Sequence, residues 1–172
     1  MTPSSPSILW VNGPFGGGKT SACQALVALD ATWRLADPEV LGCFVRDAQR
    51  SHGEDFQCHP GWTRLVVAGL VALDPSPEHP VAVAMAVHDE CRWRAIAGGL
   101  ASAGHPVRHV VLDAAPTEIE QRIDLGFTSP GDEEGNSNVH AFRLSRLPVY
   151  QQALAWLRTE TASALLAMSR TT

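Results

Sequence analysis

A glycine-rich loop between an apolar run and a helical pattern constrains this chain most. Residues 11–21 read VNGPFGGGKTS, in which Gly13, Gly18, Lys19 and Thr20 fit the pattern G-x-x-x-x-G-K-[ST]. Glycines let the backbone turn with its N–H groups pointing inward, which forms a concave anion site. The helix that follows directs its positive end at the same place. The loop therefore predicts binding of a nucleoside triphosphate.

The side chains of the loop have separate expected roles. Lys19 brings a full charge near the β and γ phosphates, and the Thr20 hydroxyl is a hard oxygen that suits Mg²⁺. ATP is favoured over GTP because the sequence has no clear N-K-x-D motif for reading guanine. The residues expected to hold the nucleotide are Gly13, Pro14, Phe15, Gly16, Gly17, Gly18, Lys19, Thr20 and Ser21.

Apolar runs and helical periodicities alternate along the chain. Strands are expected at residues 7–12, 32–36, 81–87, 106–113 and 153–158. Helices are expected around residues 22–29, 37–45, 62–73, 93–100, 117–125, 141–152 and 162–168. This alternation predicts an α/β fold, the P-loop NTPase three-layer sandwich, with a five-stranded parallel sheet between two layers of helices. A single domain over residues 1–172 is expected, because neither repeats nor a linker stand out.

A polar, acidic stretch follows these elements. Residues 126–140 read GFTSPGDEEGNSNVH and are expected to form a mobile loop. Arg143 and Arg146 come next at i, i+3 spacing, so they share one helix face. Paired arginines behind such a loop suit a lid over residues 126–150 that closes on a transferred phosphoryl group, and a solvated helix face is the alternative.

Acidic residues close two of the predicted strands. Asp37 follows the second strand, where open α/β sheets build their ligand crevice, so it is either a base for an acceptor hydroxyl or a helix cap before Pro38. Arg46, further along the same helix, reaches either the crevice or the surface. Asp113 closes the strand at 106–113, and a plain strand exit is favoured there over a magnesium ligand.

Charge and hydropathy exclude some partners. The formal net charge is −5 and no run of Lys or Arg stands out, so nucleic acid is not an expected partner. The longest apolar stretch, residues 65–73, is too short to cross a bilayer, so stable membrane insertion is not expected. The N-terminal MTPSSPS lacks the features of a signal peptide, which favours a cytoplasmic location. The sequence leaves the oligomeric state open.

Taken together, these motifs resemble the tunicamycin resistance proteins, small P-loop proteins folded like nucleoside and nucleotide kinases. The resemblance rests on the opening ILWVNGPFGGGKTSA, DPE at 37–39, DFQ at 55–57, and GHPVRHVVL at 104–112. It implies an ATP-binding protein that protects a bacterium from tunicamycin, a molecule with a uridine, two sugars and a fatty acyl chain.

The resemblance also implies roles for individual residues. The chain is similar to the chloramphenicol phosphotransferases, in which an Asp after the second strand serves the acceptor hydroxyl, and this implies Asp37 as a catalytic residue beside Lys19, Arg143 and Arg146. Arg122 is implied as a contact on the adenine side. The expected acceptor contacts are Asp37, Arg46, Phe56, Gln57, Trp62, Met85 and His88, of which Trp62 also fits the apolar face of its helix.

Three functions fit these features. The first is transfer of the ATP γ-phosphoryl group to a hydroxyl of tunicamycin, with Mg²⁺ at Thr20. The second is ATP-dependent sequestration of the drug without chemistry. The third is a small kinase for a nucleoside or a sugar metabolite, with drug tolerance incidental. The sequence does not fix the acceptor atom.

Overall fold

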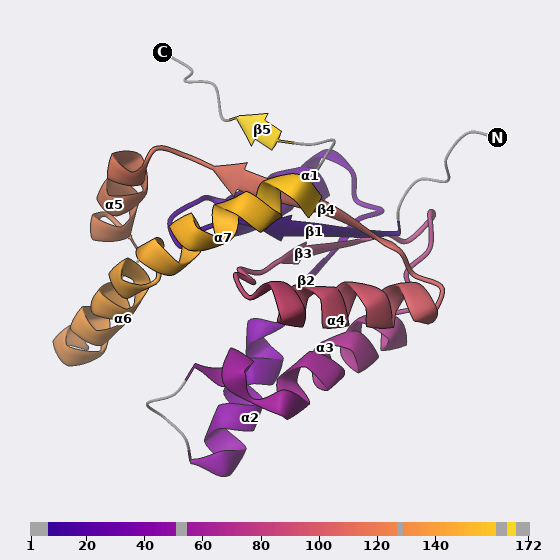
Figure 1. Ribbon diagram of the computed structural model, residues 1–172, viewed down its shortest axis with the longest axis horizontal. Coiled ribbons are helices and arrows are strands. Elements are labelled where there is room, and N and C mark those ends of the chain that lie inside the picture. Colours follow the sequence, from indigo (N-terminus) through magenta and orange to yellow (C-terminus); the bar gives the residue numbers. More distant parts are fainter. Residues whose placement is uncertain (1–6, 51–54, 127–128, 161–164, 168–172) are drawn as a thin grey trace.

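Five strands form one parallel sheet in the computed structural model (Figure 1). The strand order is β2-β3-β1-β4-β5, which confirms the predicted fold. The strands are β1 (Ile8–Asn12), β2 (Arg34–Ala36), β3 (Val81–Ala84), β4 (Val107–Asp113) and β5 (Leu165–Ala167). The structure describes residues 7–50, 55–126, 129–160 and 165–167.

Helices cover both faces of the sheet (Figure 1). They are α1 (Lys19–Leu29), α2 (Glu39–Gln49), the 3₁₀ helix η1 (Phe56–Cys58), α3 (Pro60–Ala72), α4 (Glu90–Ser102), α5 (Pro116–Asp124), α6 (Glu133–Ser145) and α7 (Leu147–Glu160). On one face, Trp10 of β1 packs with Trp62 of α3 and Trp93 of α4. On the other face, Val11 packs with Cys23 of α1. Apolar side chains on both faces of β1 therefore explain its continuous hydrophobic run.

The strand β1 lies at the centre of the sheet, between β3 and β4. In the register of the sheet, Trp10 of β1 lies between Val83 of β3 and His109 of β4. All strands are parallel, so their carboxyl ends meet at one edge, where open α/β sheets place their ligand crevice. Within the described residues, no helix combines the length and the apolar character needed to cross a membrane.

The expectation of a loop over residues 126–140 is wrong from Glu133 onward, where α6 begins. Asp132 caps this helix, since its side chain accepts a hydrogen bond from the Gly135 N–H, and Glu133 and Glu134 suit the positive end of the helix dipole. No residue of α6 is buried. The helix therefore lacks the apolar stripe that marks most helices in a sequence.

The expected last strand at 153–158 is also wrong, and the helix expected at 141–152 is helical in the structure apart from an interruption at Arg146. A turn at Arg146 separates α6 from α7, and α7 then continues to Glu160. Its buried residues recur at helical spacing and are Leu147, Tyr150, Ala153 and Leu157. The helix expected at 162–168 lies partly outside the described residues, and residues 165–167 within it form β5, which pairs with β4.

Candidate functional site

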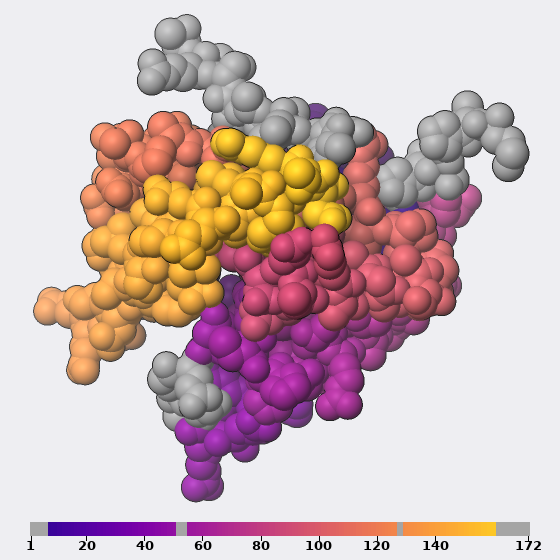
Figure 2. Space-filling model, viewed as in Figure 1, coloured from indigo at the N-terminus to yellow at the C-terminus, as the bar shows by residue number. Residues whose placement is uncertain are grey.

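A cleft of about 920 Å³ opens at the carboxyl ends of the strands. Its walls come from the glycine loop, α2, η1, the segment after β3, α5 and α6. Figure 2 shows the surface hollowed between α6 and α2. The predicted site residues that line it are Phe15, Gly16, Gly18, Lys19, Thr20, Ser21, Asp37, Arg46, Phe56, Gln57, Met85, His88, Arg122, Arg143 and Arg146. Segments far apart in the sequence thus meet in one cavity.

The glycine loop adopts backbone angles that favour glycine. Gly13, Gly16 and Gly18 have φ values of 139°, 76° and 83°. A Cβ at Gly13 would lie 2.5 Å from the Leu112 carbonyl oxygen, so β4 leaves no space for a side chain there. Gly18 is the N-cap of α1, so the loop runs directly into the helix start. The backbone therefore has the anion-binding form that the motif predicts.

The ammonium group of Lys19 lies inside the glycine loop that comes before it in the sequence. Its Nζ donates to the carbonyl oxygens of Gly13 (3.2 Å) and Pro14 (2.7 Å). Burial lowers the pKa of Lys19 to about 8, and the nearby Glu39 carboxylate opposes this shift. Thr20 is exposed to the cleft in the first turn of α1. The cationic group and the hydroxyl thus line the same cleft from the start of one helix.

Asn12, which the sequence analysis did not single out, ties the glycine loop to the end of β3. Its side chain is fully buried. Its Oδ1 accepts the N–H groups of Gly13 (2.8 Å) and Val87 (3.0 Å), and its Nδ2 donates to the Val87 carbonyl (2.8 Å). Nδ2 also lies 3.2 Å from His109 Nε2. Because these are buried hydrogen bonds, they fix the loop relative to the cleft floor.

His88 comes directly after Val87, to which Asn12 is hydrogen-bonded, and its buried, neutral side chain lines the cleft. Its Nε2 lies 3.3 Å from the Gly13 carbonyl oxygen, and its ring packs 5.2 Å from that of Tyr150 in α7. Burial lowers the pKa of His88 to about 4, helped by the charges of Lys19 and Arg146. At neutral pH it therefore offers a hydrogen-bonding ring without adding positive charge.

Two acidic residues stand at the start of α2 and face the cleft. The Asp37 Oδ1 accepts the backbone N–H of Glu39 at 2.9 Å, so Asp37 caps the helix with one oxygen while it lines the cleft. Glu39, which the sequence analysis did not assign to the site, lines the same cavity. Desolvation raises the pKa of Glu39, and the neighbouring Asp37 charge adds to this. Glu39 is the last residue of the DPE motif at 37–39, and this position was the sequence signal that could have identified it.

An ion pair joins the two sides of the cleft. Arg146, at the break between α6 and α7, lies with its Nη2 3.1 Å from Oδ2 of Asp55. Asp55 also caps η1 by accepting the Gln57 N–H. The Gln57 side chain is buried and donates to the Ala86 carbonyl at 2.7 Å. Gln57 therefore anchors η1 to the cleft floor, and Asp55 reaches from this fixed segment to Arg146.

Aromatic contacts link the glycine loop to α6. The rings of Phe15 and Phe142 lie 5.7 Å apart in an edge-to-face arrangement. Lys19 Nζ lies 5.4 Å from the centre of the Phe15 ring, and the Arg146 guanidinium lies 5.9 Å from that of Phe142. Phe142 and Val139 line the cleft from α6. Sequence analysis missed Val139 because it predicted a loop through residue 140, and it did not assign Phe142, which lies in the helix expected at 141–152, to the site.

The structure does not bring Trp62 to the cleft. Its side chain is fully buried, its Nε1 donates to the Pro38 carbonyl at 3.2 Å, and its ring packs 5.6 Å from that of Phe56. Phe56 in turn packs against Gly42, where a Cβ would collide with its ring. Trp62 thus positions α2 and η1 from behind, as expected of the buried face of α3.

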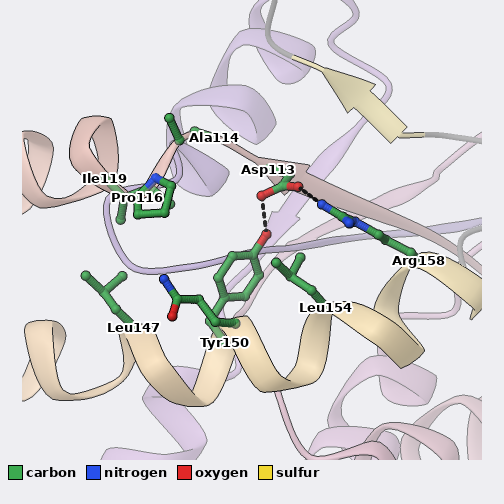
Figure 3. A pocket seen from close by; sticks show the side chains of 10 residues that line it. Asp113, Ala114, Pro116, Ile119, Leu147, Tyr150, Leu154 and Arg158 are labelled. Carbon is green, nitrogen blue, oxygen red and sulfur yellow. Dashed lines mark hydrogen bonds and ion pairs between the residues drawn. The ribbon is translucent and has the colours of Figure 1, made fainter.

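The Asp113 side chain contacts α7. Its Oδ1 accepts the Tyr150 hydroxyl at 3.0 Å and its Oδ2 pairs with Arg158 at 3.0 Å, as Figure 3 shows. These residues line a separate pocket of about 370 Å³ between the end of β4 and α7. The Asp113 carboxylate is therefore used to attach α7 to the sheet, in agreement with a plain strand exit.

Comparison with solved structures finds similar folds. The tunicamycin resistance protein of Deinococcus radiodurans is 25% identical, with a TM-score of 0.60 over 96% of this chain and 99% of that one. A sugar kinase from a Janibacter species is 16% identical, with a TM-score of 0.53 over 93% of this chain and 99% of that one. A gluconokinase from Sinorhizobium meliloti is 17% identical, with a TM-score of 0.53 over 91% and 94%. At these identities the two kinases show the fold alone.

No curated protein matches the chain. A family model described as an AAA domain matches residues 8–125, a span that runs from β1 through the glycine loop to α5. The P-loop that this span contains implies nucleotide binding. The match covers more than half of the chain, which therefore belongs to the AAA domain family, with a kinase-like P-loop fold.

Proposed function

We propose that this protein is an ATP-dependent kinase that transfers the γ-phosphoryl group to a hydroxyl of tunicamycin or of a related nucleoside-like molecule. The observation that carries the proposal is the shared cleft, which is lined by Lys19 of the phosphate loop and by Asp37 and Glu39 at the start of α2. A kinase needs these two sides together, because a phosphate clamp must face a group that handles the acceptor hydroxyl. Similarity to the Deinococcus radiodurans tunicamycin resistance protein supports the choice of acceptor.

The nucleotide would lie along the glycine loop. The loop N–H groups and Lys19 would hold the phosphates, and Thr20 would bind Mg²⁺, which supplies positive charge to the phosphate oxygens when bound. The glycine loop, with its helix start and exposed hydroxyl, fits such a group. Arg122 would contact the adenine side. We propose that residues 126–150 act as a lid, which places Arg143 and Arg146 over the transferred group.

The acceptor would lie on the opposite side of the cleft. Asp37 would orient its hydroxyl with the carboxylate oxygen that does not cap α2. Polar and apolar walls meet here, which suits a molecule with sugar rings and an apolar part. The remaining residues proposed to contact the acceptor are Arg46, Phe56, Gln57, Met85 and His88.

The test is incubation of the protein with MgATP and tunicamycin, followed by mass spectrometry of the drug and measurement of ADP. The expected result is a gain of one phosphoryl group on the drug, with one ADP per modified molecule. Drug that binds but stays unmodified would instead favour sequestration. ADP release with a sugar or a nucleoside, but not with tunicamycin, would favour a metabolite kinase.

Binding of MgATP should weaken as the pH rises above about 8, the pKa of Lys19 in the folded protein. Phosphates next to the ammonium group raise this pKa, so nucleotide binding takes up a proton once the free Lys19 begins to lose its own. Between the free and bound pKa values, affinity should fall by about tenfold per pH unit.

Calorimetry with a magnesium complex of a non-hydrolysable ATP analogue, in buffers of different ionisation enthalpy, measures both the affinity and the proton uptake. Lys19→Arg is the matched control, because a guanidinium keeps its charge over this pH range. An affinity of the wild-type protein that stays constant from pH 7 to beyond the Lys19 pKa would contradict the prediction.

A further inference from the structure

The acidic residues of the cleft differ in what they contact. Asp55 is paired with Arg146 across the cleft, and Asp37 uses one oxygen to cap α2. The Glu39 carboxylate makes no hydrogen bond or ion pair with the residues that the structure describes, although it lines the same cavity. Among the acids around the cleft, Glu39 therefore has the carboxylate that is available to a bound molecule.

Glu39 is held in place by the packing behind it. It is the first residue of α2, directly after Pro38, whose carbonyl accepts the Trp62 indole N–H. One turn further on, Gly42 packs against the ring of Phe56. The backbone at the start of α2 is thus fixed from two sides. A rigid helix start fixes the point from which the Glu39 side chain extends into the cleft.

Positive charges on both sides of the cleft act on Glu39. Lys19, Arg143 and Arg46 all interact with its carboxylate electrostatically, and Glu39 is the main charge partner that opposes the pKa depression of Lys19. Glu39 therefore lies near the groups that would surround a transferred phosphoryl. Desolvation and the Asp37 charge raise the pKa of Glu39, and such a shift makes a carboxylate a stronger proton acceptor near neutral pH.

We propose that Glu39 is a second catalytic carboxylate, which takes the proton of the acceptor hydroxyl while Asp37 orients it. This rests on the proposed kinase function. In the step, the acceptor O–H bond breaks and its proton passes to Glu39. The acceptor oxygen forms a bond to the γ-phosphorus, the bond from that phosphorus to the β,γ-bridging oxygen breaks, and ADP leaves with that electron pair. Water in the place of the acceptor would be deprotonated by the same group.

The test compares Glu39→Gln, Glu39→Asp and Asp37→Asn with the wild-type protein in the transfer from MgATP to tunicamycin. Glu39→Gln should lower kcat by about 10²–10⁴-fold, the usual contribution of a positioned base. Binding of the magnesium-bound ATP analogue should not weaken, because the lost charge is negative. Glu39→Asp should restore part of the rate. The fall of kcat toward acidic pH should disappear in Glu39→Gln and persist in Asp37→Asn.

Glu90→Gln is the matched control, because Glu90 is also the first residue of a helix, lies outside the proposed lid and does not line the cleft. It should leave kcat unchanged, and equal thermal midpoints would show that all variants fold. If the wild-type protein does not modify tunicamycin, the proposed acceptor is wrong, and the same variants are compared in ATP hydrolysis. A Glu39→Gln variant with wild-type kcat and an intact acidic limb would overturn the inference, as would wild-type protein without turnover in either assay.

Discussion

Replacing Lys19 with methionine is expected to lower the rate of phosphoryl transfer by about 10²–10³-fold, the usual effect of removing one preorganised group that stabilises charge. The ammonium lies inside the glycine loop, where it contacts the Gly13 and Pro14 carbonyls. A triphosphate in this loop would replace those weak partners with negatively charged oxygens. Methionine has a similar length and no charge, so the variant loses the charge and keeps the packing.

The measurements are initial rates of ADP formation and the affinity for the magnesium-bound ATP analogue, and both should fall. The protein should stay folded, because the lysine charge is itself desolvated and its pKa is lowered to about 8. Arg108→Met serves as the control, since Arg108 is exposed on β4 away from the cleft. Unchanged nucleotide affinity in Lys19→Met would contradict the assignment of this loop.

The second large effect concerns stability. Trp62→Ala is expected to lower the free energy of unfolding by about 3–5 kcal/mol, the range for removing a large buried aromatic side chain. Trp62 is fully buried between α3 and the sheet, and its indole N–H satisfies the Pro38 carbonyl. The variant would therefore leave a cavity and remove one of the two hydrogen bonds to the Pro38 carbonyl, which also accepts the Gly42 N–H. It would also loosen the start of α2, where Asp37 and Glu39 lie.

Urea unfolding followed by circular dichroism and fluorescence measures this loss. Leu29→Ala is the control, because Leu29 is 87% exposed and its loss should change the free energy by no more than about 0.5 kcal/mol. If the two variants lost the same stability, Trp62 would not be a core anchor. Retained stability together with lost drug binding would instead place Trp62 in the acceptor site.

The sequence predicted the parts of the site whose chemistry depends on residues that are close together in the chain. The glycine loop needs only a turn, a lysine and a helix start, all within residues 11–21, and the structure gives its glycines the expected backbone angles. The strands β1 and β3 are largely buried and β4 is buried over residues 110–112, so short apolar runs revealed them. Asp37 could be placed because its strand ends at the edge where ligands bind.

The parts that the sequence did not predict depend on partners distant in the chain. Asn12 gains its importance from Val87, and the Asp55–Arg146 pair forms only when the cleft is folded. The first turns of α6 looked like a loop because no side chain of that helix is buried. Polar residues on a solvated helix have no periodicity that distinguishes them from a turn-rich segment.

The break at Arg146 has a consequence for how this molecule can move. On one side of it, α7 is attached to the sheet by four buried side chains and by the Asp113 network, and on the other side α6 buries none. The apolar contacts that displacing α6 would disturb are those of Phe142 with Phe15 and of Leu144 with the buried cluster beneath it, and α7 has more such contacts. Arg146 lies at the junction of the two helices. A rotation of α6 about this junction would leave the Arg146 guanidinium at the cleft. Mutations in α6 can therefore change both the enclosure of the cavity and the position of Arg143, whereas Arg146 stays at the anchored end of α6.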